Sequence, residues 1–112
     1  SFIRLKPKNL IYQKQDYNME NTWEETRNKY REAVIHFLNR YDEQVSEHII
    51  DVMISVMMTR DNVLQGGSFV QAIVGNNLRE AISRADDDCS NNLKIITICC
   101  HNCYVETELL YE

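Results

Sequence analysis

The residues best suited to chemistry lie near the middle of the chain, where Gly66 and Gly67 precede Ser68. Ser68 and Gln71 match the S-x-x-Q capping box that begins a helix. The first turn of a helix presents free backbone amides, and a loop without Cβ atoms lets an anion approach them closely. This stretch predicts either an ordinary hydrated helix start or a binding site for an anion such as a phosphate.

Polar side chains on apolar helix faces are a second chemical signal. Asn77 and Arg84 project onto the apolar stripe of a helix predicted from Ser68 to about Arg84, and Arg60 falls on the stripe of the preceding helix. Burying such a group without a partner costs about 1–3 kcal/mol, and more for a charge. Arg84 therefore either binds carbonyls or an aspartate at its helix end, or it converges with Asn77 and Arg60 on one phosphate. The apolar stripe itself consists of Val70, Ile73, Val74, Leu78, Ala81 and Ala85.

Two clusters contain residue types that bind metals. The three aspartates at 86–88 lack the spaced pattern of a calcium loop and are expected at a helix start, where carboxylates complement the helix dipole. The sequence at 100–103 matches C-x-x-C, but a helical projection places its cysteines on an apolar stripe with Cys99, and His101 points away. The cysteines are therefore predicted to be buried core residues, and we expect no metal and no cofactor.

No catalytic constellation stands out. His36, His48 and His101 are scattered, no G-x-S-x-G is present, and no cysteine has an evident electropositive setting. The net charge of −5 argues against general nucleic-acid binding, which depends on neutralising phosphates with Lys and Arg. We expect a binding protein that is not an enzyme.

Length and composition limit the fold. A chain of 112 residues is one domain that buries about 60–70% of its unfolded surface. Three glycines and one proline in the whole chain favour helices over a strand-rich sandwich. No apolar run approaches 18 residues and no signal-peptide pattern occurs, which predicts a soluble protein of the cytoplasm with its cysteines as thiols.

The chain divides into two parts by charge and pattern. Residues 1–18 are basic, and Phe2 to Lys6 alternate apolar and polar residues before Pro7, which predicts an extended arm or short strand. Such an arm would dock on its own body or on a neighbouring copy. Residues 19–112 are predicted to be a helical domain.

Four helices are predicted in that domain. Thr22 begins a T-x-x-E capping box for the first helix, and a short connection makes the first two helices an antiparallel pair. The third helix runs from Ser68 to about Arg84, and the tail at 106–112 adds a last helical turn or a subunit contact. The apolar positions that define the other three helices are Trp23, Tyr30, Val34, Phe37, Leu38 and Tyr41 in the first, Val45, Ile49, Val52, Met53, Val56 and Met57 in the second, and Leu93, Ile96, Cys99, Cys100, Cys103 and Tyr104 in the fourth.

Three short motifs resemble those of a group of short, uncharacterised phage proteins. The motifs are Gly66-Gly67-Ser68-Phe69, Asn76-Asn77-Leu78 and Arg84-Ala85-Asp86, within roughly residues 60–100. This chain departs from the group's Gly-Gly-Phe and Asn-Asp-Leu by inserting Ser68 and by carrying Asn77. The resemblance implies a phage origin. Small acidic phage proteins often block host defence, either as oligomeric sponges for cyclic nucleotide or cyclic ADP-ribose-type signals or by occluding a defence protein.

The leading hypothesis is a homo-oligomeric phage anti-defence protein that sequesters a cyclic nucleotide-type signal without cleaving it. Amides of the glycine loop would meet a phosphate, the arginines would supply charge, an asparagine would bind the base or ribose, and an aromatic ring would stack. The alternative is a protein-interaction inhibitor that occludes a host defence protein through an acidic surface or the Met-rich helix. Neither hypothesis involves a membrane. The predicted ligand-binding residues are Arg60, Gly66, Gly67, Ser68, Phe69, Asn76, Asn77 and Arg84.

Overall fold

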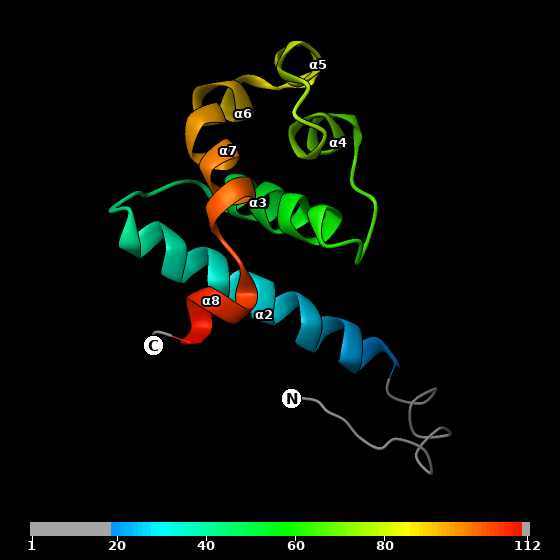
Figure 1. The fold of residues 1–112 in the computed structure, drawn as a ribbon, viewed down its shortest axis with the longest axis vertical. Helices are drawn as coiled ribbons and strands as arrows, with labels where there is room; N and C mark the ends of the chain where they lie inside the picture. The colour runs from blue at the N-terminus through cyan, green and yellow to red at the C-terminus, as the bar shows by residue number, and fades with distance from the viewer. Residues whose placement is uncertain (1–18, 111–112) are drawn as a thin grey trace.

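The computed structural model describes residues 19–110, which form seven α-helices and no strand (Figure 1). The predicted all-α class is confirmed, whereas the predicted arm at 1–18 lies outside the described residues. Within 19–110, no helix combines the length and apolar character that crossing a bilayer requires. The helices are α2 (Met19–Arg40), α3 (Glu47–Arg60), α4 (Ser68–Val74), α5 (Leu78–Arg84), α6 (Asp87–Asn91), α7 (Leu93–Asn102) and α8 (Val105–Leu110).

Helix α3 is the centre of the fold and packs against α2, α4 and α7 (Figure 1). The sequence predicted one apolar face, but apolar residues occupy more than one side of this helix. A helix that is apolar around most of its circumference belongs in the interior, with neighbours on several sides. Its buried residues are Ile49, Ile50, Met53, Ile54, Val56, Met57 and Met58.

The predicted antiparallel pair of α2 and α3 is confirmed by the order of its ion pairs. Arg27 lies 2.9 Å from Asp51, and Arg31 forms a bidentate pair with Glu47 at 3.0 Å, so numbers rise along one helix as they fall along the other. Ser46 caps α3, because its Oγ accepts a hydrogen bond from the backbone of the first turn. The buried side chains of α2 are Tyr30, Ala33, Val34, Phe37 and Leu38.

The start of α2 differs from the prediction. The helix begins at Met19, so Thr22 lies inside it and does not cap it. The apolar pattern predicts Trp23 on the core stripe, but Trp23 is 44% exposed. The T-x-x-E pattern is compatible with a first turn, yet a favourable helical sequence upstream lets the helix begin earlier.

The helix predicted from Ser68 to Arg84 is instead two helices, α4 and α5. Asn76 has a positive φ of 60°, and the next amide, of Asn77, donates to the carbonyl of Ala72 at 2.8 Å. This left-handed residue ends α4. The side chain of Asn77 then accepts from the amide of Glu80 at 3.1 Å and caps α5. Asn77 is thus a capping residue and does not project from a buried stripe.

The predicted fourth helix is also divided, at Asn92, into α6 and α7. Asp86 begins α6 by accepting from the amide of Cys89 at 2.7 Å, so the aspartate run does start a helix as expected. The four-helix count is therefore replaced by seven helices in the described residues. Cys99, Cys100 and Cys103 are buried, which confirms their prediction as core residues.

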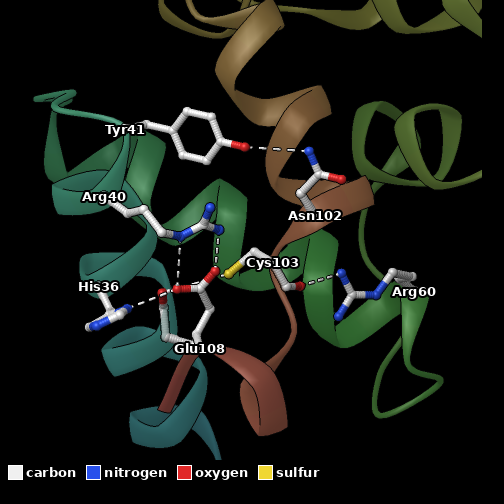
Figure 2. A network of polar contacts seen from close by, with 8 residues as sticks. His36, Arg40, Tyr41, Arg60, Asn102, Cys103 and Glu108 are labelled. Carbon is white, nitrogen blue, oxygen red and sulfur yellow. Dashed lines mark hydrogen bonds and ion pairs between the residues drawn. The ribbon is translucent and has the colours of Figure 1, made fainter. Parts of the chain in front are cut away.

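Helix α8 returns to α2 and is held there by Glu108. Glu108 is 3% exposed and is the single buried charged side chain among residues 22–109. Its carboxylate accepts from His36 Nδ1 at 2.8 Å and from the guanidinium of Arg40 (Figure 2). Burial alone would raise the pKa of Glu108, but these two hydrogen bonds outweigh it and hold the pKa below its usual range.

Replacing Glu108 by Gln is expected to lower the free energy of unfolding by about 1–3 kcal/mol at pH 7, because it removes a charged acceptor from a buried position. The folded pKa lies below the unfolded value of about 4.3, so this contribution is present above that pH and is lost as the pH falls through the folded pKa. Urea denaturation at pH 7 and at successively lower pH measures both effects.

The matched control for this prediction is Glu106→Gln, since Glu106 is exposed on the same helix. We expect the Glu106 variant to follow the wild-type pH dependence and the Glu108 variant to show a shallower loss of stability below about pH 5. Identical profiles for all three proteins would show that Glu108 does not anchor α8.

Candidate functional site

The predicted anion site at the start of α4 has a different local structure. Gly67 occupies the cap position and Ser68 is the first helical residue, so Ser68 forms no capping box. Gln71 instead donates from Nε2 to the carbonyl oxygen of Gly66 at 2.7 Å. Helix α4 has only seven residues and therefore a short stack of aligned peptide dipoles. The backbone of Gly67 is exposed to solvent. The side chain of Gln71, however, bonds to the loop itself and stabilises the turn.

Gly66 lacks a side chain for a packing reason. A Cβ atom built on it would lie 2.7 Å from Val70 Cγ1 and 2.8 Å from Ser55 Oγ, closer than real Cβ atoms approach. Its amide also donates to Thr59 Oγ1 at 2.9 Å. The loop is therefore pressed against α3, and the close approach explains this glycine without a ligand.

The side chain of Arg60 binds the end of α7. Its Nη1 donates to the carbonyl oxygen of Cys100 at 2.9 Å. It also donates to the carbonyl oxygen of Cys103 at 2.7 Å, a bond that Figure 2 shows. The guanidinium carbon also lies 4.1 Å from the centre of the Tyr104 ring, a cation–π contact. The side chain is only 13% exposed. Arg60 therefore satisfies helix carbonyls that burial would otherwise leave without donors.

Asp61 balances the charge of Arg60 and extends the network to α2. Arg60 Nε donates to Asp61 Oδ1 at 2.8 Å, and the hydroxyl of Tyr30 donates to Asp61 Oδ2 at 2.8 Å. Burial alone would raise the pKa of Asp61, but the hydrogen bonds from Arg60 and Tyr30 lower it below its usual range. Burial and the bond to Asp61 both raise the pKa of Tyr30. These groups form a satisfied ionic network.

The remaining predicted ligand residues are dispersed. Arg84 is 54% exposed and donates from Nε to Glu80 one turn earlier at 3.0 Å, so it is not on a buried face. Phe69 packs partly buried against the core. Asn76 is exposed in the turn between α4 and α5. The structure thus brings Asn76 and Asn77 together but places neither arginine with them.

The hollow beside the two asparagines is small. Its volume is about 40 Å³, close to that of one or two water molecules, and far below the several hundred Å³ of a ligand pocket. Within one chain, the predicted nucleotide site therefore has no cavity of suitable size at this turn. The lining residues are Ala72, Ile73, Asn76, Asn77, Leu78, Ala81 and Thr97.

A larger hollow lies between the loop that follows α2 and the α6–α7 segment. Its volume of about 430 Å³ is in the range of small-molecule sites. Lys94 and Glu43 supply one charge of each sign, so the hollow has no net preference for a phosphate. Sequence reasoning missed it, because its walls come from segments about 50 residues apart. The lining residues are Tyr41, Glu43, Asn91, Asn92, Lys94, Ile95 and Ile98.

Helix α5 presents large aliphatic side chains to solvent. Leu78 is 62% exposed and Ile82 is 55% exposed, and they lie one turn apart on the same helix. Ala81 is the buried residue of α5. Sequence reasoning placed Leu78 on a buried stripe, which the break at Asn77 overturns. We call Leu78 and Ile82 the α5 ridge.

Three potential metal ligands meet where α3 and α6 begin. His48 Nε2 lies 2.9 Å from Asp86 Oδ2, and the donor atoms of His48, Asp86 and Cys89 all lie within 4.8 Å of one another. The bond from the Cys89 backbone and then the contact with His48 lower the pKa of Asp86. Burial and then Asp86 raise the pKa of the Cys89 thiol to about 12. Sequence reasoning treated His48 as isolated.

No protein-family model, curated protein or solved structure matches the chain. The resemblance to phage proteins therefore rests only on the three short motifs between residues 66 and 86. The function has to be argued from the surfaces and clusters described above. Of these, the α5 ridge and the hollow of 430 Å³ are open to a partner or ligand, whereas the network around Arg60 is closed.

Arg60→Ala is expected to lower the free energy of unfolding by about 2–4 kcal/mol, because it leaves the carbonyls of α7 and the carboxylate of Asp61 without their donor. Arg84→Ala should change stability by about 0.5 kcal/mol or less, as is usual for an exposed i,i+4 ion pair. Chemical denaturation of both variants measures the difference. Equal and small effects would contradict a structural role for Arg60.

Proposed function

We propose that the chain is a non-catalytic protein-binding module of the phage anti-defence type, with α5 as its docking element. The observation that carries the proposal is the outward position of Leu78 and Ile82, the two most exposed large apolar side chains of the described residues. Full burial of one such side chain contributes about 1.5–3 kcal/mol. A partner that buries the side chains of Leu78 and Ile82 therefore gains much of this free energy as binding affinity.

The geometry of the ridge supports a helix-in-groove contact. Aliphatic residues at positions i and i+4 of a helix are the usual anchors for insertion into an apolar groove. Helix α5 has seven residues and so is about 10 Å long. Two copies joined through α5 alone would bury much less than the roughly 800 Å² per partner of a stable interface. These dimensions favour a larger protein whose surface surrounds the helix.

The positive charges on α5 indicate the charge expected on the partner's surface. Arg79 and Arg84 are exposed on α5 beside the ridge, and Arg84 already shares its charge with Glu80. The complementary surface is an apolar groove with carboxylates at its rim. The proposed partner is accordingly a host defence protein with such a groove, which this chain occludes. This role needs no cofactor and no reaction.

The double substitution Leu78→Ser and Ile82→Ser tests the docking proposal. A photo-crosslinking residue at position 79, used in host cells, identifies the protein that contacts α5, and calorimetry then measures its affinity with purified components. We expect the double variant to bind at least 100-fold more weakly, because both anchors are lost. Helicity should be unchanged, since both side chains are exposed.

Val63→Ser is the matched control, because Val63 is 39% exposed but lies in the loop before α4. It should retain the wild-type affinity. The solution mass of the wild type is measured in parallel. If the wild type self-associates and the double variant becomes monomeric, the ridge joins copies of this chain and the proposed host partner is wrong.

Sequestration of a cyclic nucleotide-type signal is the second candidate function. The hollow of about 430 Å³ supports it by its size, and Asn91 and Lys94 supply an amide and a positive charge, although Glu43 in the same lining offsets that charge. Calorimetry against cyclic dinucleotides, cyclic trinucleotides and cyclic ADP-ribose isomers tests this function. We expect saturable binding, with the ligand recovered intact, if the chain is a sponge.

Two variants locate such a ligand. Loss of binding in Lys94→Ala assigns the ligand to the hollow, whereas loss in Arg84→Ala assigns it to the glycine loop and the end of α5. Both side chains are exposed, so neither substitution should disturb folding. Absence of binding across the whole panel would exclude the sponge and leave the protein-binding role.

A further inference from the structure

A mixed set of metal-ligating groups joins α3 to α6. His48 lies in the first turn of α3, Asp86 caps α6, and Cys89 lies in α6 itself. The histidine and the aspartate are exposed, whereas the cysteine is buried. The sulfur thus forms the inner wall of the cluster, and the nitrogen and oxygen form its solvent side. An ion can enter from solvent and reach all three donors.

We propose that His48 Nε2, Asp86 Oδ2 and Cys89 Sγ bind one Zn²⁺ ion. Imidazole nitrogen, carboxylate oxygen and thiolate sulfur are the three ligand types of protein zinc sites, at about 2.0–2.3 Å from the metal. Donors at tetrahedral positions around such an ion lie about 3.3–3.8 Å apart. The donors here lie within 4.8 Å of one another, so side-chain shifts of about 1 Å complete the geometry.

The surrounding bonds hold the ligands in place. Asp86 Oδ1 accepts from the Cys89 amide at 2.7 Å, which orients the carboxylate and leaves Oδ2 on the side of His48. Ser46 Oγ donates to Asp88 Oδ2 at 2.7 Å and links the same two helix starts. Bonds of this kind restrict the ligands and raise metal affinity in characterised sites.

Binding has a simple balance of atoms. The ion takes the place of the hydrogen bond between His48 and Asp86. The proton of that bond leaves Nε2 through solvent, either to Nδ1 of a neutral ring or to bulk water from a charged one, and the Cys89 thiol proton passes to solvent as the zinc–sulfur bond forms. Water completes the fourth position. The thiolate and imidazole select against Mg²⁺ and Ca²⁺, which prefer oxygen ligands. The site requires no part of the α5 ridge, so it is independent of the proposed docking function.

Titration of chelator-treated protein with Zn²⁺, followed by calorimetry, tests the proposal. We expect one ion per chain and a rise in Tm of about 10 °C when free zinc exceeds Kd a hundredfold. Co²⁺ should replace Zn²⁺ and produce a thiolate-to-cobalt charge-transfer band in the near ultraviolet. That band reports sulfur coordination directly and does not depend on stability.

His48→Ala and Cys89→Ser should each weaken zinc binding at least 100-fold and abolish the cobalt band. The His48 side chain is 52% exposed, so that variant keeps its fold even if the buried Cys89 variant does not. His101→Ala and Cys100→Ser are the matched controls and should bind as the wild type does. Unchanged affinity in His48→Ala, or absence of stoichiometric binding to the wild type, would overturn the proposal.

Discussion

The fold depends on how the carbonyl groups at the end of α7 are satisfied. The last carbonyls of a helix have no partners within it, so a buried helix end needs donors from elsewhere. Arg60 supplies them to Cys100 and Cys103, and Asp61 offsets the cost of desolvating its charge. Tyr30 joins the same carboxylate from α2. One network therefore sets the relative positions of α2, α3 and α7, and the chain leaves it toward α8, where Glu108 closes the contact with α2.

Apolar periodicity predicted the parts of the fold that extend over many residues. The α2–α3 pair and the buried cysteines follow from it, because a stripe sustained over several turns identifies a buried face. The same periodicity did not predict the breaks at 75–77 and at Asn92. Apolar residues of two short consecutive helices fall on one projected stripe, so the pattern indicates a single longer helix. The sequence does contain a signal for the first break. Asn76 is a residue type that tolerates the left-handed conformation that ends a helix, and Asn77 is a residue type that caps the next one, with Glu80 three residues later.

The candidate site was harder to predict because partners come from distant segments. An arginine on an apolar stripe indicates that a partner exists, but it does not identify that partner. For Arg60 the partners are backbone carbonyls 40 and 43 residues away, and for His48 the partner is a carboxylate 38 residues away. Backbone acceptors leave no trace in the side-chain pattern. The sequence therefore showed that Arg60 needs a partner, but it grouped Arg60 with Asn77 and Arg84 around a phosphate. In the structure, backbone carbonyls and Asp61 take the place of that phosphate.

The ends of α5 explain how so short a helix can present a ridge. Isolated helices of seven residues are unstable in water, because nucleation costs more than a few hydrogen bonds return. Here the side chain of Asn77 caps the first turn, and Asp86, two residues beyond the last turn, begins α6. Ala81 packs between them against the body of the protein. The ridge is thus ordered before any partner arrives, so a partner that covers Leu78 and Ile82 meets a smaller entropic cost than it would with a flexible segment.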